Sequence, residues 1–473
     1  MENYLGKRGY SIFKNNFSTN DILKIRADLS VKPFINNNYI ADSKPFPVYS
    51  ESKNKLYIPR YYGINNLGIP NVFKINNGIK ININFSKNLK KKQEPIVEAY
   101  INSLNENFGG GIISVPCGYG KTVIALYIAA KLNLKTLVVV HKEFLLNQWR
   151  ERIEEFIPDA RIGRLQGKIK KIQDKDIVIG MLQSISMIEY DESLFEDFGL
   201  VIYDECHHLG AEVFSKALLK TSCKYTLGLS ATPKRNDGLS KVFQWYLGNI
   251  VFQIKKRDDN NVNVKLIEYN NSDNDYSKEI LNYMNKPNSA SMINNICYFL
   301  PRTQLIVNQI FKYLDDGRKI LVLSDRKEHL KTIKSLLEKN NKYTSGYYLG
   351  GMKPKDLEET ETKDTILGTF AMASEGFDCR EPLDTIVLTS PKSNIEQAVG
   401  RILRQEEKDR KKIPLIIDII DNFSMFKKQG EKRVKFYKKN KYNIELYNTN
   451  DEKIFNYFTN KQKNPYEFEF IED

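Results

Sequence analysis

Between positions 88 and 255, short continuous apolar runs alternate with segments in which apolar residues recur at helical spacing. Short continuous apolar runs are typical of buried strands, and apolar residues that recur every three or four positions are typical of amphipathic helices. Leu145, Trp149, Ile153 and Phe156 have the helical spacing. The expected strands cover residues 111–115, 136–140, 177–180, 200–204 and 225–230, and the expected helices cover 122–131 and 143–157. This alternation predicts a doubly wound parallel sheet, in which ligands bind at the carboxyl ends of the strands.

A second alternation of the same kind lies within residues 301–425. Its expected strands cover residues 319–324, 344–349, 365–370, 385–389 and 415–420, and an expected helix covers 327–338. The sequence therefore predicts an α/β protein with two doubly wound parallel-sheet domains, at residues 88–255 and 301–425.

Three segments outside these domains differ in composition. Residues 1–87 are rich in Asn, Pro and aromatic residues and contain short β-like runs, which predicts a small mixed or β-rich accessory domain. Its aromatic residues beside Arg60 are typical of a core, and stacking on nucleic-acid bases is the alternative. Residues 256–300 are polar and irregular and are interpreted as a linker with an extension. Residues 426–473 are interpreted as a basic C-terminal extension.

Charge and composition narrow the classes of function. The 473 residues suffice for roughly two to four domains. The net charge of +14 favours a polyanionic partner such as nucleic acid, and a lysine-rich coding bias is the alternative. No apolar run approaches the roughly 20 residues that cross a bilayer, and residues 1–10 lack the apolar segment of a secretion signal. We therefore expect a non-secreted, intracellular protein without a membrane partner. The cysteines are too far apart in the sequence for a zinc knuckle.

A glycine-containing loop follows the first expected strand. It comprises Pro116, Cys117, Gly118, Tyr119 and Gly120, and leads into Lys121 and Thr122. Backbone N–H groups of such a loop bind phosphates together with the N-terminus of the following helix. The Lys121 ammonium is then expected to reach the β- and γ-phosphates of a nucleotide, and the Thr122 hydroxyl to bind Mg²⁺. Val115 stands where the first glycine of the strict phosphate-loop motif would be.

The expected strand at 200–204 ends in two carboxylates, Asp204 and Glu205, and His207 follows them. Hydrolysis of a phosphoanhydride needs a Mg²⁺ site and an oriented water molecule. Asp204 can hold Mg²⁺ through water, and Glu205 can orient or deprotonate the attacking water. A strand that ends in acids by chance is the alternative, and the upstream Lys121 in the same β/α unit argues against it. No Cys or His partner at ligand spacing supports His207 as a metal ligand, so a switch between nucleotide and nucleic acid is favoured.

With these motifs in this order, the sequence resembles the superfamily 2 helicases, in the DExH type, over residues 88–422. The resemblance implies two RecA-like motor domains, ATP and Mg²⁺ as cofactors, and Gln93 as the residue that reads adenine. The residues that it implies for coupling hydrolysis to movement are His207, Ser230, Ala231 and Thr232. The residues that it implies for nucleic-acid contact are His141, Gln183, Ser184, Arg235, Ser324, Arg326 and Thr369.

In the second motor domain the resemblance rests on residues 375–378 and 397–404. The residues that it implies for nucleotide binding and catalysis there are Gly376, Asp378, Gln397, Arg401 and Arg404. An arginine at the transferred phosphoryl group can contribute about 10³–10⁵ in rate. A nucleotide between the domains would be held by Lys121 from one side and by the arginines from the other, so that ATP closes the cleft and hydrolysis opens it. A solvated basic helix face carrying Arg401 and Arg404 is the alternative.

Within the superfamily, residues 116–122 and 227–235 resemble the XPB-like branch, and residues 347–353 and 418–421 resemble XPB-like helicases of large DNA viruses. Two features depart from XPB itself. Arg235-Asn236-Asp237 stands where XPB has Arg-Glu-Asp, and the segment between Arg326 and Thr365 is too short for a large thumb insertion. We therefore expect a relative of XPB and not its orthologue, with a viral factory, a virion or the nucleus as the expected compartments.

The function predicted from the sequence is an ATP-dependent DNA helicase or translocase that moves along or remodels DNA, with transcription or repair proteins as candidate partners. An RNA helicase is one alternative, because the DExH motif serves both polymers. A nucleic-acid-binding scaffold with an inactive motor is the other alternative. The presence of Lys121, Asp204, Glu205 and Arg404 argues against an inactive motor.

Overall fold

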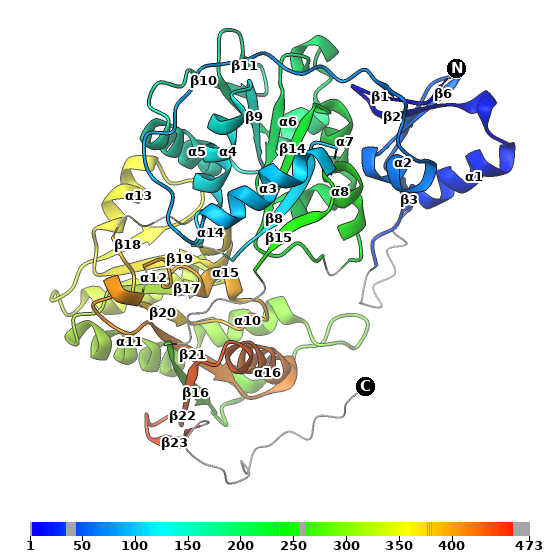
Figure 1. Ribbon diagram of the computed structural model, residues 1–473. Helices are drawn as coiled ribbons and strands as arrows, with labels where there is room; N and C mark the ends of the chain where they lie inside the picture. Colours follow the sequence, from blue (N-terminus) through cyan, green and yellow to red (C-terminus); the bar gives the residue numbers. More distant parts are fainter. Residues whose placement is uncertain are drawn as a thin grey trace. The chain divides into compact units, whose positions relative to one another are not determined.

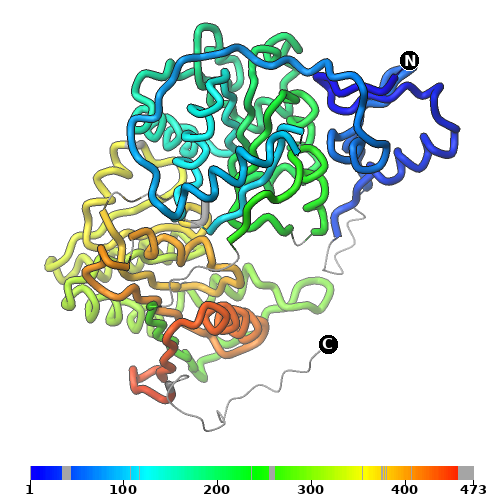
Figure 2. Tube along the Cα trace, viewed as in Figure 1, coloured from blue at the N-terminus to red at the C-terminus, as the bar shows by residue number. Residues whose placement is uncertain are grey.

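A computed structural model describes residues 2–34, 44–106, 108–116, 118–235, 237–254, 261–375, 377, 379, 381–405 and 407–456. The chain divides into two compact units, Met1–Lys255 and Lys256–Asp473. Each unit is an α/β structure built on a mainly parallel sheet, as the sequence pattern predicts (Figure 1, with the path of the chain in Figure 2).

An eight-stranded sheet forms the centre of the first unit, in the order β11-β10-β12-β9-β13-β14-β8-β15. Its strands are β8 (Gly110–Ser114), β9 (Thr136–Val140), β10 (Ile162–Gln166), β11 (Ile169–Lys171), β12 (Ile177–Met181), β13 (Leu200–Tyr203), β14 (Tyr225–Ser230) and β15 (Ile250–Gln253). All neighbouring strands are parallel except β10 and β11. The helices are α3 (Glu94–Glu106), α4 (Lys121–Leu132), α5 (Glu143–Phe156), α6 (Leu182–Met187), α7 (Glu212–Lys220) and α8 (Ser240–Leu247), with 3-10 helices at Glu192–Phe195 and Cys206–Gly210.

Successive residues of the central strands enter opposite cores. In β13, Leu200 and Ile202 pack with residues of α3, α4 and α5, whereas Val201 and Tyr203 pack with residues of α6, α7 and α8. Because helices cover both faces of the sheet, its parallel strands are apolar on both sides. This is why they are visible in the sequence as continuous apolar runs.

The N-terminal segment forms a small mixed sheet in the order β5-β6-β2-β1-β7. Its strands are β1 (Tyr4–Gly6), β2 (Gly9–Phe13), β5 (Ser50–Glu51), β6 (Lys55–Ile58) and β7 (Val72–Phe73), with a separate pair of β3 (Ser30–Val31) and β4 (Phe46–Pro47). Its helices are α1 (Thr19–Asp28) and α2 (Arg60–Leu67), with a 3-10 helix at Lys14–Asn16. The apolar side chains of this segment continue into the core beneath α8.

Arg60 joins the N-terminal segment to the larger sheet. Its side chain is buried and donates hydrogen bonds to the carbonyl oxygens of Phe108 and Lys224, each at 3.1 Å. Tyr61 and Tyr62 beside it are also buried. The core interpretation of these two aromatic side chains is therefore correct, and they do not form a platform for bases.

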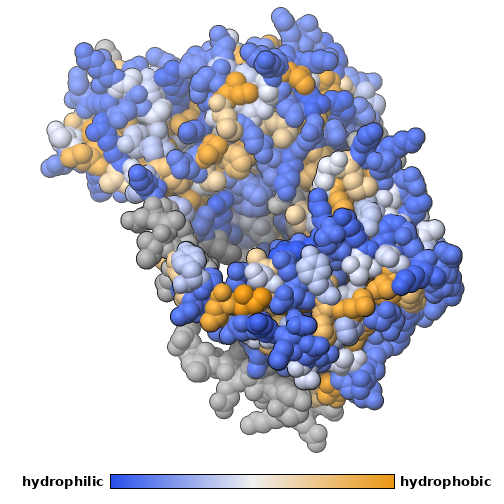
Figure 3. All heavy atoms as spheres, turned by 180° about the vertical axis from the view of Figure 1, so that it is seen from behind, coloured by the Kyte–Doolittle hydropathy of each residue, from blue (hydrophilic) through white to orange (hydrophobic). Residues whose placement is uncertain are grey.

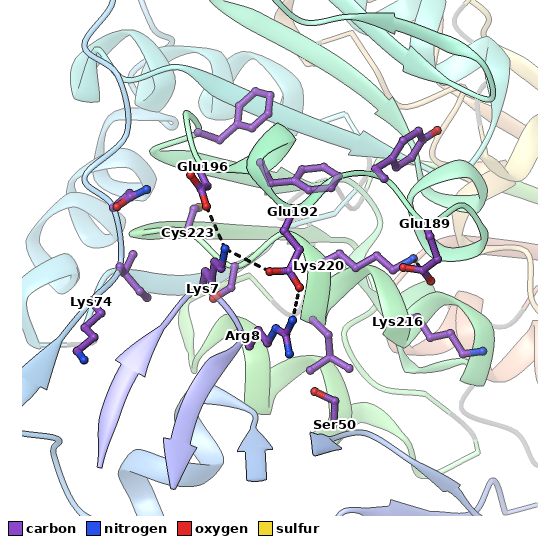
Figure 4. Close-up of a pocket in the computed structure, with 17 residues that line it drawn as sticks. Lys7, Arg8, Ser50, Lys74, Glu189, Glu192, Glu196, Lys216, Lys220 and Cys223 are labelled. Atoms are coloured by element: carbon purple, nitrogen blue, oxygen red, sulfur yellow. Dashed lines mark hydrogen bonds and ion pairs between the residues drawn. The ribbon is translucent and has the colours of Figure 1, made fainter. Parts of the chain in front are cut away.

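A cavity of about 580 Å³ lies between the N-terminal sheet on one side and, on the other, α7 and the segment between α6 and β13 (Figure 4). Lys7 and Arg8, from the turn between β1 and β2, lie opposite Glu192 and Glu196. Lys7 Nζ lies 3.2 Å from Glu192 and 3.0 Å from Glu196, and Arg8 also pairs with Glu192. These side chains are largely exposed, and ion pairs of that kind stabilise little. The shared core and Arg60 therefore hold the two parts together.

The second unit contains another eight-stranded sheet, in the order β18-β19-β17-β20-β21-β16-β22-β23. Its strands are β16 (Asn263–Tyr269), β17 (Ile320–Ser324), β18 (Ser345–Tyr348), β19 (Thr365–Thr369), β20 (Thr385–Leu388), β21 (Leu415–Asp421), β22 (Asn443–Tyr447) and β23 (Lys453–Asn456). Among these described strands, every neighbouring pair is parallel except β22 and β23. The helices are α9 (Asn274–Ser277), α10 (Ser289–Tyr298), α11 (Leu300–Asp315), α12 (Lys327–Glu338), α13 (Pro354–Glu361), α14 (Phe370–Glu375), α15 (Glu396–Val399) and α16 (Ser424–Lys439), with a 3-10 helix at Glu407–Asp409.

The segment interpreted as a linker contains a central strand of this sheet. β16 pairs in parallel with both β21 and β22, so residues from the expected linker and the expected C-terminal extension complete one sheet (Figure 1). Lys265 interrupts the apolar run of β16. Because of this polar residue, the hydrophobic pattern did not predict a strand here. The buried ammonium of Lys265 donates to Gln309 Oε1 at 2.7 Å and pairs with Asp451, partners that lie far away in the chain.

None of the helices in the described part of the chain is long and apolar enough to cross a membrane. On the face shown in Figure 3, hydrophilic side chains predominate and hydrophobic ones form small patches between them.

Candidate active site

The loop between β8 and α4 contains the predicted phosphate-binding residues. Those within the described part of the chain are Pro116, Gly118, Tyr119 and Gly120, whereas Cys117 lies outside it. Gly118 and Gly120 have φ angles of 87° and 80°, a region that favours glycine. A Cβ atom on Gly120 would lie 2.4 Å from Gln93 Nε2. Helix α4 begins at Lys121 directly after this loop, so its N-terminus is available to an anion, which fits a nucleotide phosphate.

Gln93 is fixed against the same loop. It is 4% exposed, its Nε2 donates to the Tyr119 carbonyl oxygen at 2.9 Å, and its Oε1 accepts from the Lys90 N–H at 3.0 Å. Gln93 therefore supports the loop in this structure. Its role in reading adenine stays a prediction.

Lys121 and Glu205 form an ion pair between the loop and the end of β13. Lys121 Nζ lies 2.6 Å from Glu205 Oε1, and the two side chains are 11% and 13% exposed. Glu205 has a φ angle of 47°, so the chain turns sharply after the strand. Burial would raise the pKa of Glu205, but the positive charge of Lys121 outweighs it and lowers that pKa to about 2. The carboxylate is therefore ionised, and a phosphate in the loop would compete with it for Lys121.

Asp204 is held in place by a tryptophan from a different element. Trp149 of α5 donates its indole Nε1–H to Asp204 Oδ2 at 2.9 Å, and the Glu205 N–H donates to Oδ1 at 3.0 Å. Burial and the neighbouring charge of Glu205 raise the pKa of Asp204. Asp204 and Thr122 offer the hard oxygen ligands that Mg²⁺ takes alongside phosphate oxygens and water. The oxygen atoms of Asp204 and Thr122 are therefore suitable ligands for Mg²⁺.

Three histidine rings lie beside these carboxylates. His207 Nδ1 is 3.1 Å from Ser230 Oγ and 3.4 Å from Glu205 Oε2. The ring centroid of His208 lies 4.3 Å from that of His207 and 4.1 Å from that of His141. Burial lowers the pKa of all three imidazoles, that of His208 to about 3, so the rings are neutral near pH 7.

Two of the residues predicted for nucleic-acid contact in the first unit, Gln183 and Arg235, bond to the backbone of these histidines. Gln183 Nε2 donates to the His141 carbonyl oxygen at 2.6 Å, and Ser184 Oγ accepts from the Gly167 N–H at 2.9 Å. Arg235 donates to the His207 carbonyl oxygen and pairs with Asp237, whereas Asn236 lies outside the described residues.

The predicted coupling residues at the end of β14 and directly after it are linked by one hydrogen bond. The Thr232 N–H donates to Ser230 Oγ at 3.2 Å, and Ala231 lies between them. The structure thus gathers the predicted nucleotide, coupling and nucleic-acid residues of this unit at the carboxyl ends of its strands.

Two of the predicted residues of the second unit, Ser324 and Thr369, stand opposite each other at the ends of β17 and β19. Ser324 at the end of β17 bonds to His329 Nδ1 at 3.1 Å and accepts from the Arg326 N–H at 3.2 Å. Arg326 also donates to the Ala290 carbonyl oxygen at 3.0 Å. Thr369 ends β19, and its hydroxyl accepts from the Met372 N–H at 3.4 Å.

Two arginines of this unit follow a short helix instead of lying on it. Helix α15 contains Gln397 but ends at Val399, so the helix face proposed as the alternative for Arg401 and Arg404 is absent from this described stretch. Arg401 Nε donates to the Ala373 carbonyl oxygen at 2.6 Å, and Arg404 donates to that of Phe377. Gly376 and Asp378 lie outside the described residues.

Sequence reasoning missed Trp149 and His208. The helical spacing of Trp149 indicated a core position, and only the need of a buried indole N–H for a partner could have suggested more. His208 stands beside a motif residue in the sequence, but its contact with His141 depends on the fold.

Comparisons with known proteins identify the family of this chain. Residues 86–235 match the model of the family described as "Type III restriction enzyme, res subunit". The chain is 38% identical over 448 residues to "Putative ATP-dependent RNA helicase L396" of Acanthamoeba polyphaga mimivirus, which covers 92% of this chain and 85% of that protein. It is 27% identical over 376 residues to "Putative ATP-dependent RNA helicase QP509L" of African swine fever virus, which covers 74% of this chain and 72% of that protein.

A solved structure shares the fold. It is a fragment of a "putative HsdR subunit of a type I restriction enzyme" from Vibrio vulnificus, with a TM-score of 0.52 at 15% identity over 79% of this chain and 71% of that chain. The mimivirus relative covers nearly the whole chain at an identity that establishes common family membership. The chain therefore belongs to helicase superfamily 2, whose members use ATP and bind nucleic acid.

Proposed function

We propose that this protein is an XPB-like motor that hydrolyses ATP to move along or remodel DNA, in transcription or repair. The observation that carries the proposal is the 2.6 Å ion pair between Lys121 and Glu205. It joins the phosphate loop to the carboxylate that can activate water, which are the two parts that hydrolysis of a phosphoanhydride needs close together. The net charge of +14 favours a polyanionic track.

The roles of the residues follow from their contacts. Lys121 exchanges Glu205 for the nucleotide phosphates, and the ionised Glu205 then accepts a proton from the attacking water. Asp204, oriented by Trp149, and Thr122 would hold the metal ion. When bound, Mg²⁺ neutralises charge on the phosphate oxygens.

The arginines of the second unit supply the remaining positive charge in this proposal. Arg401 and Arg404 would leave the carbonyl oxygens of residues 373 and 377 and stabilise the charge on the transferred phosphoryl group. Because they belong to a different unit from Lys121, hydrolysis would depend on closure of the two units around ATP. His207, between Glu205 and Ser230, would report the state of the nucleotide to the nucleic-acid residues.

An RNA track is the second candidate function. The relatives from mimivirus and African swine fever virus both carry the name of an RNA helicase. An RNA-dependent motor would use the same nucleotide residues, so the choice of polymer is independent of the proposed chemistry.

A panel of polymers separates these candidates. ATP hydrolysis is measured alone and with a single-stranded DNA, its duplex and an RNA of the same sequence. We expect hydrolysis that depends on Mg²⁺ and rises most with DNA. A larger increase in ATP hydrolysis with RNA than with DNA would identify RNA as the polymer on which the motor acts. Tight polymer binding without hydrolysis would identify an inactive scaffold.

A further inference from the structure

His208 occupies the middle of a continuous row of three rings. Its centroid lies 4.1 Å from that of His141, with the ring planes 37° apart, and 4.3 Å from that of His207, with the planes 35° apart. His141 follows β9, and His207 and His208 lie in the 3-10 helix after β13. The row therefore joins the ends of two neighbouring strands of the same sheet.

Each outer histidine is bonded, through its backbone oxygen, to a residue with a predicted contact to nucleic acid. Gln183 donates to the backbone oxygen of His141 at 2.6 Å, and Arg235 donates to that of His207. On the nucleotide side, His207 Nδ1 lies 3.4 Å from Glu205 Oε2 and 3.1 Å from Ser230 Oγ. The row thus begins at the predicted polymer contacts and ends at the proposed general base.

The spacing of the rings limits how they can move. Centroids this close put the ring atoms in van der Waals contact, and packed side chains cannot be compressed into one another. A displacement of His141 must therefore be taken up by His208 and then by His207. The three rings are neutral near pH 7, so no charge repulsion separates them.

We propose that His208 is a positioning residue that transmits polymer binding at His141 to His207 and Glu205 by ring-to-ring contact. This inference rests on the proposed function, because it presupposes that a polymer stimulates hydrolysis. It assigns His208 no contact with the nucleotide or with the polymer. Its role is to make the stimulated rate different from the basal rate.

The test compares His208→Ala with His208→Phe. Alanine removes the ring, whereas phenylalanine keeps a planar ring of similar size and removes the nitrogens. ATP hydrolysis is measured against the concentrations of ATP and of the polymer that stimulates the wild type most. For His208→Ala we expect the maximal stimulation to fall about 5-fold or more, with the basal rate and the polymer concentration at half-stimulation nearly unchanged. His208→Phe should retain most of the stimulation.

Each contrary result overturns the proposal in a recognisable way. Full stimulation of His208→Ala would show that the ring transmits nothing. An equal loss of the basal and stimulated rates would place His208 in general structural support of the site. A folded His208→Phe with the defect of the alanine variant would exclude ring contact as the cause. If His208→Ala does not fold, His208→Gln provides the comparison without an aromatic ring.

A double-mutant cycle tests the path through His141. His141→Ala, His208→Ala and the double variant are compared at saturating polymer. Residues that act through one contact are not additive, so the double variant should lose no more stimulation than the more severe single variant. Additive losses would overturn the path through His141. Absence of stimulation in the wild type would overturn the proposed function as well, whereas a stimulated His208→Ala overturns this inference alone.

Discussion

The two sheets use acidic residues near their strand ends in opposite ways. In the first unit, Glu205 pairs with Lys121, and both side chains remain slightly exposed to solvent. In the second unit, Asp421 on β21 is fully buried against Arg302, with two bonds of 2.7 and 2.8 Å. Tyr276 donates a further hydrogen bond to Asp421 at 2.8 Å.

The second acid of β21 is enclosed in the same manner. Asp418 accepts from Arg433 Nε at 2.8 Å and from the Tyr437 hydroxyl at 2.9 Å, and all three residues are buried. A carboxylate enclosed by a fixed guanidinium cannot turn to a ligand, whereas a carboxylate held by one lysine at a phosphate loop can be released. The three acids therefore differ in their partners, a lysine for the proposed site residue Glu205 and a buried arginine for Asp418 and Asp421.

The largest effect on ATP turnover is expected from the ion pair of Lys121 and Glu205 in the first unit. Lys121→Ala and Glu205→Gln should each abolish turnover, for different reasons. Lys121→Ala removes the ammonium that binds phosphate and should weaken ATP binding, whereas Glu205→Gln keeps the shape of the site and should still bind ATP. Titration with a nucleotide and steady-state hydrolysis distinguish the two variants. Near wild-type hydrolysis by Glu205→Gln would refute its assignment as the general base.

Arg404→Ala tests whether a residue of the second unit serves the site in the first. Hydrolysis should fall about 10³-fold, because the charge on the transferred phosphoryl group loses a partner. Affinity for nucleic acid should stay nearly unchanged, and a DNA-binding titration beside the hydrolysis assay measures both quantities. Loss of DNA binding with an intact basal rate would assign Arg404 to the polymer track instead.

Loss of the buried ion pair between Arg302 and Asp421 should lower the stability of the second unit. Arg302→Ala leaves Asp421 charged and buried, which should lower the free energy of unfolding of this unit by about 3–5 kcal/mol. Denaturant unfolding followed by circular dichroism measures the change. Lys331→Ala, which removes an exposed ion pair with Glu328 in the same unit, is the matched control and should change stability little. Equal stability of the two variants would contradict the structural role of the buried pair.

The sequence predicted the parts of the molecule that depend on local pattern. Strands such as β9 and β13 were predicted because both of their faces are apolar, and Lys121 and Asp204 were predicted because motifs lie at strand ends. Strand β16 was missed because its polar Lys265 is satisfied by Gln309 and Asp451, which are distant in the chain.

In the candidate site, too, contacts between elements distant in the chain could not be predicted from the sequence. The hydrogen bond from Trp149 to Asp204 joins α5 to the end of β13, and the contact of His141 with His208 joins two strand ends. No periodicity or motif in the chain encodes either contact. The fold brings these residues together, so their roles could be inferred only from the structure.

Trp149→Phe should have a smaller effect than the changes in charge. Phenylalanine retains the packing of α5 but cannot donate the hydrogen bond to Asp204 Oδ2. Loss of a bond that orients a metal ligand commonly weakens metal affinity by about 10–100-fold, so half-maximal hydrolysis should need more Mg²⁺. Binding of a fluorescent nucleotide at graded Mg²⁺ gives a readout that is independent of turnover. An unchanged Mg²⁺ dependence in both assays would show that the indole serves packing alone.

The smallest effect is expected from the basic surface of α16. Removal of residues 426–473 cannot test this surface, because it would delete β22, β23 and the buried Arg433 together with the lysines. Lys428, Lys432 and Lys439 are exposed, and their spacing places them on one side of the helix.

Replacing all three lysines by Gln isolates their charge from the fold. If this side of α16 binds the phosphate backbone, the slope of log affinity against log salt should become shallower by about 0.7–0.9 for each phosphate group that is no longer neutralised. A control variant with Gln at Lys331, Lys339 and Lys355, which are also exposed in the second unit, removes the same number of charges. If α16 binds the polymer and the control lysines do not, only the first set changes the slope, because a charge that contacts no phosphate releases no counterions on binding. Equal slopes in both sets would identify the helix as a solvated surface, and the net positive charge would then act on DNA only at long range.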